Sequence, residues 1–342
     1  METAFYSEIK CQPAALRATL AAYEKNDFAL IKEAIALISR APALVMSGMG
    51  TSYNVCLCAL KGLAGIQRVN AVQSYQLLQN DCAEIRDGDL LLLISQSGES
   101  AEIVELCSRR RGKNRIICIT NDVHSSLAKA ASLVLPLYCI EEKSITNCTF
   151  TASLAVLQLL CACAQGRSLH ALASELLKAS DEAEYFLSSE SEIFALADSF
   201  AGIDRVHFIG WSGLEVSLAE QAALTFKEGA NINAACFSAG SFRHGPMELC
   251  GEKHTAILFV SDNESADALG RLARLMRANG SNVIFISNKP FDGCGLRIQA
   301  GSPEAFAVVA AIIVEMLIVR SAQQRGKEAG VFTIAKKICK EI

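Results

Sequence analysis

The stretch Leu90–Ser100, Leu-Leu-Leu-Leu-Ile-Ser-Gln-Ser-Gly-Glu-Ser, is the part of this sequence that best indicates its fold. Five apolar residues followed at once by small hydroxyl and amide side chains are typical of a strand buried on both faces that ends in a ligand-binding loop. We expect a helix to begin at Ser100, which places Ser95, Gln96 and Ser97 at the positive end of its dipole. Such a loop suits a phosphate group, although an ordinary capped loop has the same composition.

A similar loop lies earlier in the chain. Ala43–Ser47 predicts a short buried strand, and the glycine-punctuated turn Gly48–Ser52 follows it before a helix through about Ala64. Glycine lets the backbone approach a ligand closely, and Thr51 and Ser52 can either cap the helix or bind a ligand. Taken alone, this turn indicates no more than a capped helix.

Further strands are expected at Val69–Ser74, Arg115–Thr120 and Leu133–Leu137, with helices between them. Strands separated by helical stretches predict an α/β fold with a doubly wound parallel sheet, which binds ligands outside the carboxyl ends of its strands. Both hydroxyl loops are expected at that edge, and together they favour phosphate binding. The polar run after the last strand places Thr146 and Asn147 near the same edge as further substrate contacts.

The pattern then repeats. Positions 48, 95 and 121 pair with positions 210, 261 and 288, which are 162, 166 and 167 residues further on, occupied by Gly, Ser and Asn in both copies. A nearly constant separation indicates an internal duplication of one α/β unit. The second copy reads Ser-Asp-Asn-Glu from Ser261, in place of the Ser-Gln-Ser loop, so its chemistry must differ.

We therefore divide the chain into an N-terminal helical arm, a first domain, a helical connector, a second domain and a tail, at residues 1–40, 41–167, 168–203, 204–326 and 327–342. The sequence begins without the basic end and apolar centre of a signal peptide. The longest apolar helix, around Phe306–Val319, is interrupted by Glu315 and is expected to be too short to span a bilayer.

Composition excludes several classes of partner. The formal net charge is −4, which argues against a nucleic-acid or anionic-membrane surface. Most of the fourteen cysteines lie inside apolar stretches, as small core residues of a reduced, cytoplasmic protein do. No cysteine pair has the spacing of a zinc or redox motif, so we expect no metal and no cofactor.

The second copy contains the best candidates for acid–base chemistry. Glu228 lies at the end of an expected helix, and His244 lies between Arg243 and a Gly-Pro turn. A carboxylate and an imidazole suit the transfer of a proton between adjacent carbons of a sugar. A histidine in a turn can also be structural, so the residues alone leave both interpretations open.

Four motifs in order carry a family resemblance: Gly50–Asn54 (Gly-Thr-Ser-Tyr-Asn), Ser95–Ser100, Lys227-Glu228 followed sixteen residues after the glutamate by His-Gly-Pro, and Thr333–Lys336. Together they resemble the isomerase half of glucosamine-6-phosphate synthase (glutamine:fructose-6-phosphate aminotransferase), over nearly the whole chain. That half is a tandem of sugar isomerase (SIS) domains. The resemblance implies two such domains, each a doubly wound parallel sheet flanked by helices.

The resemblance also implies roles for single residues. The sugar phosphate would be held beside Gly50 by Thr51, Ser52, Ser95, Gln96, Ser97 and Ser100. Glu228 would move a proton between C1 and C2, and His244 would act in ring opening after reaching into a neighbouring subunit's site, which implies a homodimer or higher homo-oligomer. Lys336 would form a Schiff base with an open-chain ketose.

Two departures from the family pattern bear on the reaction. Only about forty residues precede the first expected strand, so we expect no glutaminase domain, and Thr225 stands where the synthase has a second lysine. We therefore expect an enzyme that releases the amine from a 6-phosphorylated amino sugar or ketosamine, as a deaminase or deglycase. The alternatives are an aldose–ketose phosphate isomerase without nitrogen chemistry and a non-catalytic sugar-phosphate sensor. A sensor has no need of Glu228, His244 and Lys336 together.

Overall fold

The computed structural model describes residues 3–65, 68–203, 205–334 and 337, and it contains two compact units. The first-sheet unit is formed mainly by Ala15–Ile140 and Cys148–Ser174. The second-sheet unit is formed by the residues up to Ala14, by Glu141–Asn147 and by Glu175–Thr333. The predicted arm is thus divided at Ala14, and the polar segment Glu141–Asn147 belongs to the second-sheet unit. The sequence did not indicate either division.

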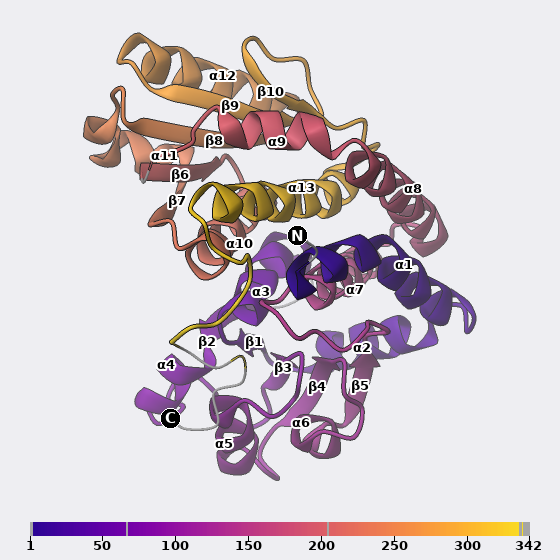
Figure 1. Cartoon of the computed structure of the whole chain (residues 1–342). Helices are drawn as coiled ribbons and strands as arrows, with labels where there is room; N and C mark the ends of the chain where they lie inside the picture. Colours follow the sequence, from indigo (N-terminus) through magenta and orange to yellow (C-terminus); the bar gives the residue numbers. More distant parts are fainter. Residues whose placement is uncertain (1–2, 66–67, 204, 335–336, 338–342) are drawn as a thin grey trace. The chain divides into compact units, whose positions relative to one another are not determined.

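The first-sheet unit contains five parallel strands in the order β2-β1-β3-β4-β5 (Figure 1). They are β1 (Leu44–Gly48), β2 (Val69–Gln73), β3 (Leu90–Ile94), β4 (Arg115–Thr120) and β5 (Leu133–Pro136). The two central apolar runs, β1 and β3, are buried at every residue. This confirms the predicted doubly wound sheet, and the strand order reverses direction between β1 and β3.

Helices precede, connect and follow these strands. They are α1 (Ala4–Glu24), α2 (Ala29–Arg40), α3 (Thr51–Leu63), α4 (Ser74–Gln79), α5 (Ala101–Arg109), α6 (Ser126–Ala130) and α7 (Cys148–Ala164). Helix α1 begins in the second-sheet unit and ends in the first. Cys56, Cys107 and Cys118 are buried in this unit, as the sequence predicts for small core residues.

The second-sheet unit repeats the topology. Its strands are β6 (Arg205–Gly210), β7 (Ala234–Ser238), β8 (His254–Val260), β9 (Asn282–Ser287) and β10 (Cys294–Arg297), all parallel in the order β10-β9-β8-β6-β7. Read in reverse, this is the order of the first sheet, which confirms the duplication. The sequence analysis predicted the edge strands β2 and β5 but not β7 and β10, whose mixed residues Ala-Ala-Cys-Phe-Ser and Cys-Gly-Leu-Arg show no run of large apolar side chains.

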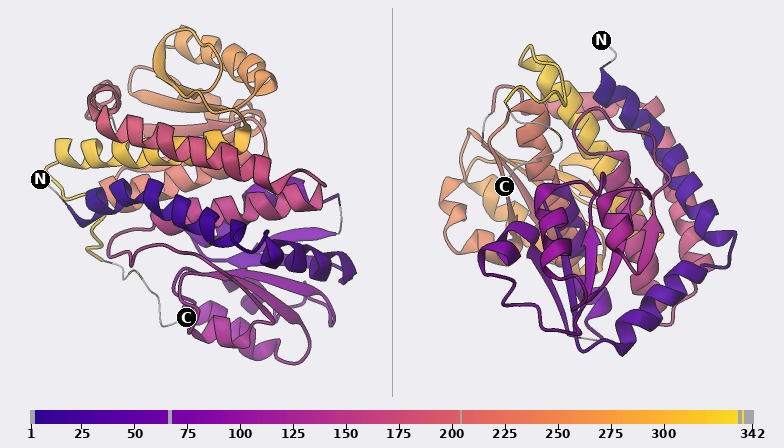
Figure 2. Two further views of the ribbon diagram at one scale, coloured as in Figure 1. Left: turned by 90° about the vertical axis from the view of Figure 1, so that its right-hand side faces the viewer. Right: turned by 90° about the horizontal axis from the view of Figure 1, so that it is seen from below.

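The helices of this unit are α8 (Leu169–Ser188), which begins in the first-sheet unit, then α9 (Glu190–Asp198), α10 (Gly213–Ala230), α11 (Ala239–Arg243), the 3-10 turn η1 (Pro246–Leu249), α12 (Asn263–Ala278) and α13 (Pro303–Gln324). Helix α13 packs along α10 (Figure 2). It has 22 residues, so the expectation that it is too short to cross a membrane was wrong: its length and composition suffice. In its most apolar window, 94% of the helix is buried inside the protein. A buried core helix meets the same criteria of length and composition as a membrane-spanning helix.

Candidate functional site

The two hydroxyl loops meet at the topological switch point of the first sheet, which is the position between β1 and β3 where the strand order reverses. β1 and β3 are parallel neighbours, so the turn after Gly48 and the loop after Ile94 leave the same edge. A Cβ atom on Gly48 would lie 2.8 Å from the Cβ of Ser52 and 3.0 Å from the carbonyl oxygen of Ile94, so only glycine fits between the two loops. Ligands of doubly wound sheets bind at this position.

The loop after β3 is held by its own hydrogen bonds. The Oγ of Ser95, a buried residue, accepts a hydrogen bond from the backbone N–H of Gly98 (3.1 Å) and lies 3.4 Å from the Oγ of Ser100. The carbonyl oxygen of Gln96 accepts from the backbone N–H of Asn121 (3.0 Å). Gln96, like Ser97 and Ser100, remains only half-buried. The backbone is therefore fixed while hydroxyl and amide groups stay accessible to a ligand.

Both helices that begin at this edge lack a side-chain cap. Gly50 precedes α3 and Ser100 precedes α5, and neither helix start has a capping hydrogen bond from the side chain at that position. Thr51 and Ser52 are the first two residues of α3. The first N–H groups of a helix need acceptors, and together with the helix dipole they attract anions.

The second sheet fills the equivalent position with a carboxylate. Glu215 is buried, and its Oε2 accepts hydrogen bonds from the backbone N–H groups of Trp211 (3.0 Å) and Ser212 (3.1 Å). Its Oε1 accepts from the N–H (2.8 Å) and the Oγ (2.7 Å) of Ser261, which follows the neighbouring strand β8. The 162-residue separation of Gly48 and Gly210 places Tyr53 at the corresponding position of the first copy. Sequence reasoning missed Glu215, although the capping-box spacing Ser-x-x-Glu is visible there.

Glu228 and His244 do not meet within one chain. Glu228 is half-buried in the last turn of α10, which leads back to the amino end of β7. His244 is exposed and follows α11, beyond the carboxyl end of β7. Because β7 has five residues, the two side chains are separated by a strand about 17 Å long.

Three other predicted site residues lie outside the hydroxyl loops. Asn147 is fully buried, and its Nδ2 donates to Glu8 (3.0 Å) and to the carbonyl oxygen of Ile145 (3.1 Å). Its amide thus has partners within the protein, and its contact with substrate stays a prediction. Thr146 is half-buried and stays a prediction. Lys336 lies outside the described residues.

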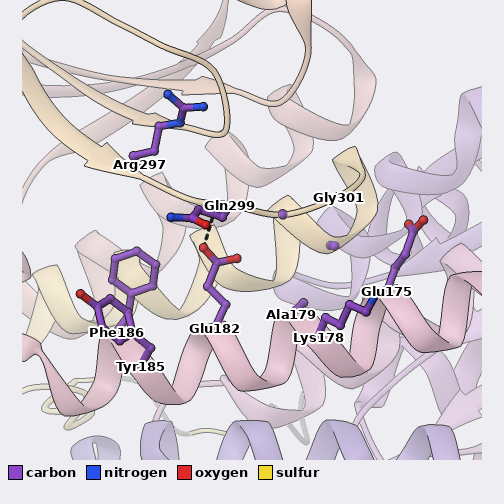
Figure 3. A pocket seen from close by; sticks show the side chains of 11 residues that line it. Glu175, Lys178, Ala179, Glu182, Tyr185, Phe186, Arg297, Gln299 and Gly301 are labelled. Carbon is purple, nitrogen blue, oxygen red and sulfur yellow. Dashed lines mark hydrogen bonds between the residues drawn. The ribbon is translucent and has the colours of Figure 1, made fainter.

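A cavity of about 580 Å³ in the second-sheet unit is lined by α8 and by the segment after β10 (Figure 3). Glu182 lies on its α8 wall and accepts a hydrogen bond from the backbone N–H of Gln299. Burial raises the pKa of the Glu182 carboxyl. None of the predicted site residues lines this cavity, so cavity volume does not locate the site. In the described part of the chain, no group of three or more His, Cys, Asp or Glu side chains could hold a metal ion.

Comparisons with known proteins agree with the geometry of the sheets. Residues 37–162 and 199–316 match the model of the SIS domain family. The chain belongs to the SIS family. A glutamine–fructose-6-phosphate aminotransferase (isomerizing) of Aeropyrum pernix is 30% identical over 316 residues, which cover 88% of this chain and 49% of that protein. The chain spans about half the length of the curated relatives it matches.

Solved SIS structures show the same fold. The C-terminal domain of the glucosamine-fructose-6-phosphate aminotransferase of Francisella tularensis superposes with a TM-score of 0.87 at 23% identity, covering 96% of this chain and 98% of that one. The tagatose-6-phosphate ketose/aldose isomerase of Escherichia coli superposes with a TM-score of 0.83 at 20% identity, covering 97% and 96%. The chain is thus similar to phosphosugar isomerases and to the isomerase part of the aminotransferase.

Proposed function

We propose that this SIS protein is an enzyme that binds a 6-phosphorylated amino sugar or ketosamine at the first sheet and releases its amine after proton transfer between C1 and C2. The contrast between the two switch points carries this proposal. In the second sheet four hydrogen-bond donors surround the carboxylate of Glu215. In the first sheet the corresponding sequence position holds Tyr53, and neither helix start has a capping hydrogen bond from the side chain of the preceding residue.

The chemistry of this contrast favours a phosphate ligand. The second copy shows that the arrangement accepts a negative group from the chain itself. The first copy offers the hydroxyls of Thr51, Ser52, Ser95, Ser97 and Ser100 and the amide of Gln96 instead. Neutral donors at a helix N-terminus bind phosphate without lysine or arginine, so an external anion fits there.

We assign the proton transfer to Glu228. A carboxylate base suits the abstraction of a proton next to a carbonyl group. The start of the C-terminal tail lies beside it, because the backbone N–H of Gly330 donates to the carbonyl oxygen of Gly229 (3.3 Å). Lys336 is six positions after Gly330 in the sequence, and six residue steps can extend at most about 21 Å. This reach supports the family role of Lys336, a Schiff base with the open-chain sugar.

His244 is assigned to ring opening in a neighbouring copy. Within one chain it lies beyond the opposite end of β7 from Glu228. Two groups that act on one sugar must lie within about a sugar's length of each other, so a homodimer or higher homo-oligomer supplies the pair.

The environment of Thr225 supports amine release rather than synthesis. This residue occupies the position that the resemblance gives to a second lysine. It is buried, and its hydroxyl donates to the carbonyl oxygen of Gln221 (2.9 Å) inside α10. A hydroxyl bound in this way cannot replace an ammonium group at the site.

The test has two parts. Fructose 6-phosphate in D₂O reports proton exchange at C1 by NMR, and glucosamine 6-phosphate or phosphorylated fructosamines report amine release. We expect Glu228→Gln to abolish both, whereas Glu220→Gln, on the same helix, leaves both near wild type. Wild-type exchange in Glu228→Gln would refute the assigned base. Exchange by the wild-type protein without amine release from any of these substrates would instead identify an aldose–ketose isomerase.

A further inference from the structure

A set of hydrogen bonds in the second-sheet unit begins at Glu8 on the N-terminal helix α1. The carboxylate of Glu8 is buried and accepts from the backbone N–H groups of Lys143 (2.5 Å) and Ser144 (3.3 Å). It also accepts from the Oγ of Ser144 and from the Nδ2 of Asn147 (3.0 Å). All these donors belong to one short segment, residues 143–147. A buried carboxylate is tolerated only while such donors surround it, so helix and segment hold each other in place.

The same segment contacts the start of the C-terminal tail. The backbone N–H of Ile145 donates to the carbonyl oxygen of Gly330 (3.3 Å), and the N–H of Gly330 donates to Gly229 of α10 (3.3 Å). A Cβ on Gly229 would lie 2.5 Å from Ile318 and 2.9 Å from Ile145. Gly330 has φ +76°, and its Cβ would lie 2.6 Å from Phe5 of α1. Helix α1, the segment and the tail therefore pack closely against the turn of α10 that precedes β7.

A second contact fastens α1 to α13. The Nε2 of Gln12, one turn after Glu8, donates to Oε2 of Glu315. Burial raises the pKa of Glu315 well above its ordinary value, and the negative charges of Glu142 and Glu8 act in the same direction. The Oε1 of Glu142 in turn accepts from the backbone N–H of Asn147 (3.1 Å). Two buried side chains of α1 thus fix its position in the unit.

We propose that Glu8 is a positioning residue for the proton transfer at Glu228. This inference rests on the function proposed above. In this proposal Glu8 acts through residues 143–147, which hold Gly330 against Gly229, the residue next to Glu228. The tail that leads to Lys336 departs from the same place. Removing the negative charge of Glu8 leaves donors of the segment unpaired and loosens this contact.

The test compares Glu8→Gln with Glu215→Gln. Both changes neutralise a buried carboxylate that accepts four or more hydrogen bonds in the same unit, but only Glu8 is linked to Gly229. We expect Glu8→Gln to slow C1 proton exchange of fructose 6-phosphate about 10- to 100-fold, because small displacements of a base have effects of this size. Calorimetric affinity for the sugar phosphate is expected to stay within about twofold, because the hydroxyl loops belong to the other unit.

Hydrogen–deuterium exchange provides a readout that is independent of catalysis. We expect Glu8→Gln to speed amide exchange at Ile145 and Gly330 more than Glu215→Gln does, because a loss of global stability affects both variants whereas only Glu8 anchors the segment. Unchanged C1 exchange in Glu8→Gln, or amide exchange no faster than in Glu215→Gln, would overturn the proposal, and so would an equal loss of C1 exchange in Glu215→Gln. Absence of C1 exchange in the wild-type protein would overturn the proposed function and the positioning role of Glu8 together, while amide exchange still reports on the anchoring.

Discussion

A buried pair of histidines in the second sheet predicts that this protein loses stability in mild acid. The Nε2 of His254, at the start of β8, lies 3.0 Å from the Nδ1 of His207 on β6, and its Nδ1 lies 2.9 Å from the Oγ of Ser281. His254 is fully buried, and the rings of Phe242 and Phe237 flank the pair. Burial, together with the neighbouring His207 and Arg205, lowers the pKa of His254 to about 4.

The direction and size of this stability change follow from the difference between the pKa of His254 in the folded and in the unfolded protein. An unfolded chain protonates this imidazole near its ordinary pKa of 6.5, whereas the folded protein resists until about pH 4. Between these values the unfolded state binds more protons, so acid favours unfolding. The stabilisation is fully present above pH 6.5 and is lost as the pH falls toward 4. For His254 alone the loss amounts to about 3 kcal/mol, at 1.36 kcal/mol for each tenfold change in proton affinity. Burial lowers the pKa of His207 as well, which increases the loss of stability in acid.

Urea unfolding at a series of pH values between about 7.5 and 4.5 measures this effect. Burial also raises the pKa of Glu182, so the decisive quantity is the difference between wild type and His254→Gln. We expect the variant to be less stable at neutral pH but to lose less stability on acidification. His124→Gln, at an exposed position, serves as the matched control and keeps the wild-type slope. Equal slopes in wild type and His254→Gln would refute the reasoning.

Three further predictions concern the switch points. Gly98 has φ +63°, and a Cβ atom there would lie 2.1 Å from the Oγ of Ser125. Gly98→Ala is therefore expected to destabilise the protein by more than about 2 kcal/mol in urea unfolding and to weaken phosphate binding. Unchanged stability of the variant would contradict this prediction. Glu215→Gln removes the acceptor of two of the four hydrogen bonds to this side chain. We expect the free energy of unfolding, measured in urea, to fall by about 3 kcal/mol. A decrease below about 1 kcal/mol would show that the carboxylate is dispensable. Tyr53→Glu places a carboxylate at the position that corresponds to Glu215 of the second copy. We expect it to weaken the calorimetric affinity for fructose 6-phosphate at least about tenfold, with Tyr53→Gln as the uncharged control. Wild-type affinity in Tyr53→Glu would refute the equivalence of the two positions.

The central strands could be predicted because their sequence signal is local. A strand buried on both faces reads as a continuous apolar run, and β3 is five consecutive apolar residues that are all buried. The edge strands β7 and β10 face neighbours on one side only, and their mixed side chains resemble loops. The hydroxyl loops were predictable for the same reason as β3, since each continues directly from its strand.

The contacts that surround Glu228 could not be predicted in this way. Glu8 and Asn147 are 139 positions apart, and no pattern in either segment indicates that one accepts a hydrogen bond from the other. The burial of Asn147 was not predictable because a polar run after a strand is typical of a solvated loop, whereas here a buried carboxylate from a distant helix accepts a hydrogen bond from its amide. The separation of Glu228 from His244 depends on β7, which the sequence did not indicate.

The duplication explains why the two halves of the chain take different tasks. In the second copy the loops after two neighbouring strands direct four hydrogen-bond donors to the carboxylate of Glu215. These donors therefore have their acceptor within the chain itself. The first copy has Tyr53 at the corresponding position and supplies no carboxylate there. In the proposed function a sugar phosphate binds the first-sheet unit and stabilises it, while the second-sheet unit contributes acid–base groups rather than a second phosphate site.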